Sequence, residues 1–317
     1  MMLKLRTEIE RTPLRQLIGC REGVLLLGSC FTDHIGTWMG EHWLKVLCNP
    51  WGVLFNPASI ALSLQRVLSD NRTDSPFELQ ALNGRYYSFA HHGKWSDTDA
   101  DVLQQKLVAL DAEVRTFWNE ACHVIITLGT SWVYEREGRI VANCHKFPAS
   151  EFVRRSLSVE EIVGLWEPII AASDTKHFVF TVSPIRHVRD GLHGNQLSKS
   201  TLLLAVEALQ KRFGQQVEYL PVYELMMDDL RDYRFYADDL VHPSSLAIQV
   251  VKELVADCCF DSRLKQYMKE AEPLVKALQH RPSDPESDEY RQFLQDTLQH
   301  KDALLVKYCM TSPHFGV

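Results

Sequence analysis

Short apolar runs alternate with longer stretches in which apolar residues recur every three or four positions along most of this chain. Three runs, at residues 24–27, 123–128 and 177–182, have the length and the residue types of buried strands. The stretch 100–118 instead carries its apolar residues at helical spacing. Strands that alternate with helices predict an α/β fold, with three layers (α/β/α) around a mostly parallel sheet.

The same spacing predicts the remaining elements. Further helices are expected at 31–43, 58–68, 158–173, 197–213 and 246–260, further strands at 45–48 and 217–220, and a hairpin at 132–135 and 139–143. Ser158-Val159-Glu160-Glu161 has the capping-box pattern that begins a helix. Residues 71–99 have no clean period and are interpreted as an insertion that contains a short hairpin.

The end of the chain has a different character. Residues 261–317 are helical in pattern and charged, with a break at the Pro-rich segment 281–285. We therefore expect two parts, a domain over residues 1–260 and a C-terminal helical extension over residues 261–317.

A serine stands where the first predicted strand ends. Gly28-Ser29 follows the apolar run 24–27 and precedes a predicted helix. Such a turn places a hydroxyl at the carboxyl end of the sheet, where open α/β folds build their sites. The alternative is that Ser29 only caps the helix, since serine is a common N-cap residue.

A second segment supplies what a serine nucleophile requires. A serine hydroxyl needs a histidine base beside it and a carboxylate behind that histidine. Asp239 and His242 lie in a predicted loop before the helix at 246–260, and Pro243 suits the first helical position. An Asp three positions before a His can curl back to its ring, so Asp239 is preferred over Asp238 as the orienting acid.

Charge and length restrict the other classes of function. The 34 Lys and Arg against 41 Asp and Glu give a net charge of −7, and there is no long basic run, which disfavours nucleic-acid binding. The run at 24–27 is too short for a signal peptide or a membrane span. We expect a cytoplasmic protein that does not bind a membrane.

The cysteines and histidines indicate neither a metal nor a cofactor. Eight cysteines are scattered without paired Cys-x-x-Cys spacing, which fits reduced thiols better than a zinc site or a disulfide scaffold. His91, His92, His187 and His193 match no recurrent ligand spacing and are interpreted as surface or packing histidines. Cys30 as a thiol nucleophile, with Cys144-His145 as helpers, is a weaker alternative to a small buried side chain.

Seven short segments in order along the chain carry a family resemblance. They are LGSCF at 27–31, NPWG at 49–52, NP at 56–57, TLGTSW at 127–132, NCHK at 143–146, SPIRH at 183–187 and DLVHPS at 239–244. Together they resemble the GSCFA-domain family, a bacterial family placed among the SGNH/GDSL-type hydrolases. Thr32 stands where the alanine of the family name is expected.

The resemblance implies a serine esterase with Ser29 as nucleophile, His242 as base and Asp239 as orienting acid. The wider superfamily uses an asparagine in its third motif to bind the oxyanion, but this chain has Gly129-Thr130-Ser131 there. Candidate donors or site-lining residues are Gly52, Ser131, Asn143 and His145, with the backbone N–H groups of Ser29 and Gly52 preferred.

Two kinds of function follow from this resemblance. The first is hydrolysis of a small-molecule or carbohydrate ester, for example removal of an acetyl group, or acyl transfer by the same acyl-enzyme. The second is a catalytically weak scaffold that binds a glycan or a protein through the 71–99 insertion or the C-terminal helices.

Overall fold

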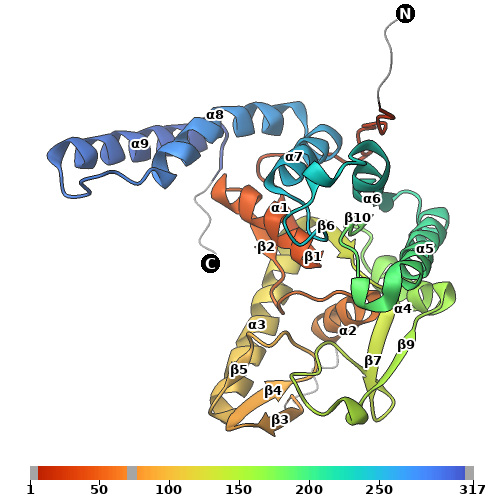
Figure 1. Ribbon diagram of the computed structural model, residues 1–317. Helices are drawn as coiled ribbons and strands as arrows, with labels where there is room; N and C mark the ends of the chain where they lie inside the picture. Colours follow the sequence, from red (N-terminus) through yellow and green to blue (C-terminus); the bar gives the residue numbers. More distant parts are fainter. Residues whose placement is uncertain (1–5, 70–76, 311–317) are drawn as a thin grey trace, which may run out of the picture.

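The computed structural model describes residues 6–69 and 77–310. At its centre lies a sheet of five strands in which all neighbours run parallel (Figure 1). In spatial order the strands are β11 (Val217–Tyr219), β10 (His177–Val182), β6 (Ala121–Leu128), β1 (Gly23–Gly28) and β2 (Val46–Cys48).

Alternating side chains of the strands face two separate cores. Leu25 and Leu27 of β1 point into one core, whereas Val24 and Leu26 point into the other. The first core is covered by α2 (Pro57–Leu68), α3 (Ala100–Glu120), α4 (Val159–Ala171) and α5 (Gly191–Arg212). The second is covered by α1 (Cys30–Glu41), α6 (Val222–Glu224), α7 (Ser245–Cys259) and α8 (Ser262–Gln279). The predicted three-layer α/β/α fold is confirmed.

The helix boundaries follow from their caps. Ser158 and Glu161 form the predicted capping box of α4, because each side chain binds the other residue's backbone N–H. The prediction for Pro243 is wrong: α7 begins at Ser245, with the Ser244 hydroxyl accepting the N–H of Ala247. Pro243 instead forms an isolated antiparallel bridge with Tyr236.

Two small antiparallel sheets extend from the central domain. One is β3 (Leu79–Leu82), β4 (Arg85–Ser88) and β5 (Ser96–Asp97), within the predicted insertion, of which residues 71–76 lie outside the described residues. The other is β8 (Arg139–Val141), β7 (Trp132–Arg136) and β9 (Val153–Ser156), in that spatial order. Short helical turns η1 (Ala149–Glu151), η2 (Val188–Asp190), η3 (Leu225–Asp229) and η4 (Tyr233–Phe235) complete the connections.

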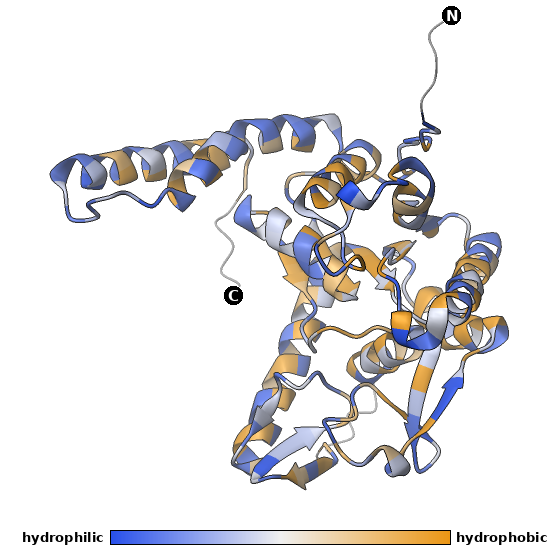
Figure 2. Cartoon of the chain, in the orientation of Figure 1, coloured by the Kyte–Doolittle hydropathy of each residue, from blue (hydrophilic) through white to orange (hydrophobic). Residues whose placement is uncertain are grey.

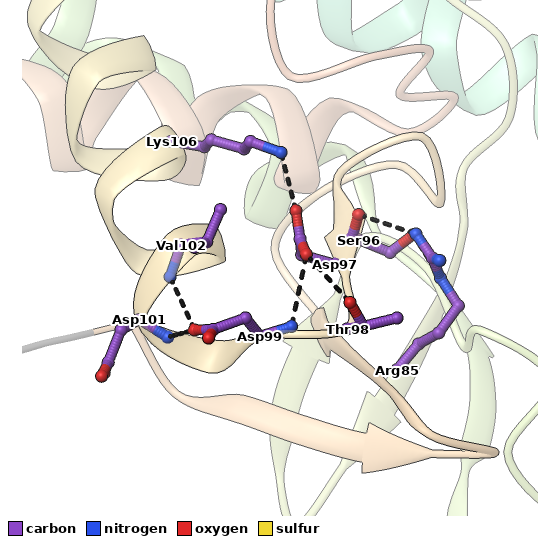
Figure 3. Close-up of polar contacts among 8 residues, drawn as sticks. All are labelled: Arg85, Ser96, Asp97, Thr98, Asp99, Asp101, Val102 and Lys106. Carbon is purple, nitrogen blue, oxygen red and sulfur yellow. Dashed lines mark hydrogen bonds and ion pairs between the residues drawn. The ribbon is translucent and has the colours of Figure 1, made fainter.

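The insertion is fastened to α3 where β5 ends (Figure 3). Asp99 is the N-cap of α3 and accepts the backbone N–H groups of Asp101 and Val102. The ammonium of Lys106, one turn further along α3, lies 2.6 Å from Asp97 Oδ2. The Lys106 contact and a hydrogen bond from the Asp99 N–H lower the pKa of Asp97 to about 2. These contacts fix the start of α3 against the small sheet.

Helices α8 and α9 (Asp288–Lys307) form an arm that projects from the domain (Figure 1). Hydrophilic residues run along the length of the arm, whereas the strands of the central sheet are hydrophobic (Figure 2). The arm is attached near its base, where the Tyr267 hydroxyl donates to His42 O at 2.7 Å and the Tyr308 ring packs on Tyr267. Within the described residues, no helix combines the length and the apolar character needed to cross a membrane.

Candidate active site

The turn that carries Ser29 requires a glycine before it. Gly28 has a φ of 137°, and a Cβ at this position would lie 2.2 Å from Thr127 O on the neighbouring strand β6. No L side chain fits this combination of backbone angle and space. The chain therefore leaves β1 sharply and enters α1 directly after Ser29.

Ser29 occupies the N-cap position of α1, but its hydroxyl caps nothing. The residue is 2% exposed, and Oγ has no hydrogen-bond partner among the described residues. Buried hydroxyls are normally paired, and within the described part of the chain the Ser29 hydroxyl shares its lack of a partner with those of Thr32, Ser59 and Thr181. The capping alternative for Ser29 does not account for this geometry.

Ser29 lies at the point where the strand order of the sheet reverses. From β1 the chain goes outward to β2, then returns across β1 to β6 and continues to β10 and β11 in the opposite direction. The carboxyl ends of β1 and β6 flank the switch point, and open α/β sheets bind their ligands in this crevice. Ser29 follows β1 and Gly129 follows β6, so both border the crevice.

A connecting segment passes over the crevice from β1 to β6. The N–H of Leu54 donates to Gly28 O at 3.1 Å, and the next carbonyl, that of Phe55, accepts the N–H groups of Gly129 at 2.7 Å and Thr130 at 3.1 Å. The segment therefore joins the two turns that border the crevice. The Phe55 side chain is 42% exposed and leaves an apolar ring at the rim.

Asn49, which directly follows β2, holds the turn that carries Ser29. Its Oδ1 accepts the N–H of Gly28 at 2.8 Å, and its Nδ2 donates to Asp33 Oδ1 at 2.6 Å. The residue is 4% exposed and has a φ of 42°, a conformation that asparagine tolerates better than most residues. Both ends of the amide are thus used to hold Gly28 and α1.

Asp239 and His242 form a compact pair in the loop before α7. Asp239 Oδ2 lies 2.5 Å from His242 Nδ1, and Oδ1 accepts the backbone N–H groups of Val241 and His242, each at 2.9 Å. The contacts with His242 and Val241 lower the pKa of Asp239 to about 2, so the carboxylate stays ionised. The pair leaves the Nε2 side of the ring directed away from Asp239. Asp238 takes no part in these contacts.

This loop is held at the carboxyl edge of the sheet. Arg186, which follows β10, donates to Leu240 O at 2.6 Å and stacks its guanidinium 4.7 Å from the Tyr236 ring centroid. His34 on α1 marks the other side of the loop. Its pKa is lowered by partial desolvation, opposed by Asp33, and then lowered further by Lys252 and His242. The contact with Arg186 thus places the loop that carries His242 at the same edge of the sheet as Ser29.

The structure does not join Ser29 to His242 by a hydrogen bond, because Ser29 Oγ has no partner among the described residues. The side chains of His242 and Asp239 are 51% and 50% exposed, whereas Ser29 is buried. Asp239 and His242 are thus paired with each other, and Ser29 is separate from this pair. Catalytic hydrogen bonds in free enzymes are often long and close only around substrate.

The two preferred oxyanion donors are both occupied. The N–H of Ser29 donates to Thr127 O at 3.2 Å, and the N–H of Gly52 donates to Asn49 O at 2.8 Å. The first bond continues the ladder between β1 and β6, and the second closes the tight turn that starts at Asn49. Neither N–H group is free in this conformation, and the choice of Ser29 and Gly52 as oxyanion donors stays a prediction.

Ser131, Asn143 and His145 also have local partners. Ser131 is fully buried, its N–H donates to Ser198 Oγ at 2.8 Å, and its Oγ lies 2.8 Å from Ser156 Oγ. Asn143 Oδ1 accepts the N–H of His145 at 2.9 Å, and His145 Nε2 donates to Ser88 O at 2.8 Å. No contact among the described residues links these three to Ser29, Asp239 or His242. They join the small sheets to the domain.

A wide groove lies away from this crevice. It has a volume of about 960 Å³ and runs along β2, lined by α1, α3 and the segment around Lys94. Neither Ser29 nor His242 lines it. Among the described residues there is also no group of three or more His, Cys, Asp or Glu side chains arranged to hold a metal ion.

Three residues that hold the turns around the crevice were assigned no role in the sequence analysis: Asn49, Arg186 and Lys199, whose ammonium donates to Gly129 O and Ser183 O. The first two stand inside the NPWG and SPIRH segments, so their positions could have been singled out. Lys199 precedes Leu202 and Val206 by three and seven positions, which places it on the buried face of α5. A lysine on the apolar face of a predicted helix is the sequence signal that could have singled out Lys199.

Comparisons with known proteins agree with the motif segments. The family model described as "GSCFA family" matches residues 23–254, and the one described as "GSCFA domain protein, C-terminal domain" matches residues 271–311. No curated protein matches the chain. One similar solved structure is a carbohydrate esterase family 2 enzyme with a carbohydrate-binding domain, from Corynascus thermopiles (Myceliophthora fergusii). It is 12% identical with a TM-score of 0.34, over 82% of this chain and 69% of that one, and at this score it carries no argument.

The first family match spans most of the chain, from the start of β1 to within α7, and so includes Ser29, Asp239 and His242. The protein belongs to the GSCFA family.

Proposed function

We propose that this protein is a serine-dependent ester hydrolase of the SGNH type. The observation that carries the proposal is the buried, unpaired hydroxyl of Ser29 at the switch point, together with a His242 whose ring and backbone are held by Asp239 in a loop at the same edge of the sheet. A structural serine would cap α1, and a structural histidine would not need a carboxylate aligned on Nδ1. The residue types and their order along the chain match those of the SGNH superfamily, which this chain resembles.

Each residue has a defined role in the proposed reaction. Ser29 Oγ attacks the ester carbonyl while His242 Nε2 takes its proton, giving a tetrahedral oxyanion. His242 then returns the proton to the leaving alcohol, and water, deprotonated by the same imidazole, releases the acid from Ser29. Asp239 keeps the Nδ1–H tautomer of His242 and stabilises the imidazolium that forms in each step.

The proposed acyl group is small, such as acetyl, and the proposed alcohol is a carbohydrate. This part rests on the family resemblance rather than on a contact in the crevice. Transfer to a second hydroxyl instead of water would use the same acyl-enzyme.

The test is hydrolysis of an activated acetate ester by the wild type and by Ser29→Ala. Loss of the nucleophile should reduce kcat by a factor on the order of a thousand or more. Ser59→Ala is the matched control, because Ser59 is likewise buried at 4% exposure with an unpaired Oγ, but on α2. Equal activity of wild type and Ser29→Ala would overturn the proposal.

A second function, binding without efficient catalysis, is favoured by two observations. Ser29 Oγ does not contact His242, and the N–H groups of Ser29 and Gly52 are both occupied. A scaffold of this kind would bind a glycan or a protein and leave an activated ester unhydrolysed. Folded wild-type protein that lacks esterase activity would favour this alternative.

A further inference from the structure

Lys199 of α5 is a charged residue in the interior of the protein. It is 1% exposed, and its ammonium donates to Gly129 O and to Ser183 O, each at 2.6 Å. These two carbonyls directly follow β6 and β10. The lysine therefore ties together the carboxyl ends of two adjacent strands, beneath the crevice that Ser29 borders.

Within residues 6–69 and 77–310, no carboxylate forms an ion pair with this ammonium. Carbonyl oxygens satisfy two of the three ammonium protons, and the third has no partner among the described residues. Burial without an opposite charge is costly and persists only where it serves a purpose. Desolvation accordingly lowers the pKa of Lys199 to about 7, with Cys30 acting weakly in the opposite direction.

Cys30 and His187 are the titratable groups that face Lys199. Burial and then Asp33 raise the pKa of Cys30, whereas the N–H groups of Cys30 and Phe31 and then Lys199 lower it. Burial and then Lys199 lower the pKa of His187 to about 4, so its imidazole is neutral at physiological pH. Asp190 and Arg154 act on His187 with opposite signs. Asp33 and Lys199 are thus the charges that act on Cys30, with opposite signs, and Asp33 acts more strongly.

A second buried lysine provides a contrast. Lys176 also donates to two carbonyls, those of Trp118 and Ala121, and it is 7% exposed. Its partners lie at the end of α3 and the start of β6, on the opposite edge of the sheet from Ser29. Capping a helix end accounts for Lys176. Lys199 caps no helix and instead holds two turns of the crevice.

We propose that Lys199 is a positioning residue of the crevice, which fixes the Gly129 turn and places a buried positive charge beneath the turn that carries Ser29. This inference rests on the proposed function. The charge favours the oxyanion that forms when Ser29 attacks, in the part of the site where the superfamily's asparagine is missing.

The experiment measures the rate at which a fluorophosphonate probe labels Ser29, from pH 6 to pH 9, in the wild type, Lys199→Met and Lys176→Met. At pH 6.5 we expect labelling of Lys199→Met to be roughly thirtyfold slower than that of the wild type, as for the loss of an oxyanion-stabilising group. The difference should shrink towards pH 9, because the wild-type lysine has then lost its proton. Lys176→Met should label within about twofold of the wild type.

A difference that does not change with pH, or an equal loss in Lys176→Met, would overturn the role of the charge. If Lys199→Met does not fold, Lys199→Gln takes its place, because it keeps a donor and removes the charge. Circular dichroism verifies the fold of each variant.

A second measurement does not depend on esterase chemistry. Alkylation of Cys30 by iodoacetamide, followed by peptide mass spectrometry, reports the charge at the turn through the thiolate fraction. Without Lys199 the alkylation at pH 6.5, where the wild-type lysine is mostly protonated, should slow by roughly threefold or more. An unchanged rate would overturn the proposal even if Ser29 reacts. A third result separates the two proposals. If the wild-type protein does not react with the fluorophosphonate, but Cys30 is alkylated more slowly in Lys199→Met than in the wild type, the proposed function fails and the buried charge beneath the turn is supported.

Discussion

Asp239 holds both the ring and the backbone of His242. One carboxylate oxygen lies 2.5 Å from Nδ1, and the other accepts the His242 N–H at 2.9 Å. The three-residue spacing makes this possible, because Leu240 between them adopts a φ of 58° and turns the chain back. The Asp239–His242 contact is thus encoded within four consecutive residues.

Replacement of Asp239 by Asn should therefore lower esterase turnover far more than it lowers stability. An amide can still accept the backbone N–H groups, but it no longer favours the Nδ1–H tautomer or the imidazolium. We expect a loss in kcat on the order of a thousandfold. Asp238→Asn changes the same charge one position away and should leave kcat within about twofold. Similar kinetics for the two variants would argue against Asp239 as the orienting acid.

Gly28→Ala should prevent the formation of a stable domain. The new Cβ would lie 2.2 Å from Thr127 O, and both atoms belong to backbone that is held in the central sheet. In contrast, Gly164→Ala in α4 meets nothing within 4 Å, so it should stabilise the helix by about 0.5–1 kcal/mol. Thermal unfolding of the two variants measures both effects. A Gly28→Ala protein as stable as the wild type would show that the turn can relax.

The buried His91 should make the protein sensitive to acid. His91 is 0% exposed, and burial, followed by Arg66, lowers its pKa to about 3. In the unfolded chain the same imidazole binds a proton below about pH 6.5. The unfolded state therefore binds more protons between these values, and this residue's contribution to stability is lost as the pH falls through the window.

His91→Gln removes this contribution. Between pH 6.5 and pH 4.5 the variant should lose about 1–2 kcal/mol less unfolding free energy than the wild type, as measured by urea titrations at each pH. His193→Gln, at an exposed position, serves as the control and should follow the wild type. If the unfolding free energy of His91→Gln fell with pH as steeply as that of the wild type, His91 would not be the acid-sensitive group.

The elements of the fold could be predicted where burial sets a clear period. The runs at 24–27, 123–128 and 177–182 became β1, β6 and β10, because buried parallel strands need apolar residues on both faces. Where burial sets no clear period, one element was missed and another begins at a different residue. Strand β9 is polar and pairs only at the edge of a small sheet, and α5 begins at Gly191 rather than at 197 because its first turns are exposed.

The site was predictable in part. Ser29, Asp239 and His242 were singled out because their chemistry requires these residue types in these local contexts, and their roles stay predictions. The partners of the two N–H groups could not be predicted, because hydrogen bonding of a backbone N–H depends on tertiary contacts: Thr127 O accepts that of Ser29, and Asn49 O, in a left-handed turn, accepts that of Gly52. The role of Lys199 likewise appears only when β6 and β10 lie side by side.

The central claim is that Ser29 is a reactive nucleophile, and the most direct measurement is the site of a fluorophosphonate adduct. Folded wild-type protein is treated with the probe, digested and mapped by mass spectrometry, with Ser29→Ala and Ser59→Ala in parallel. The account predicts one adduct, on the peptide that contains Ser29, present in Ser59→Ala and absent in Ser29→Ala. A folded wild-type protein with no adduct, or with an adduct that persists in Ser29→Ala, would contradict it.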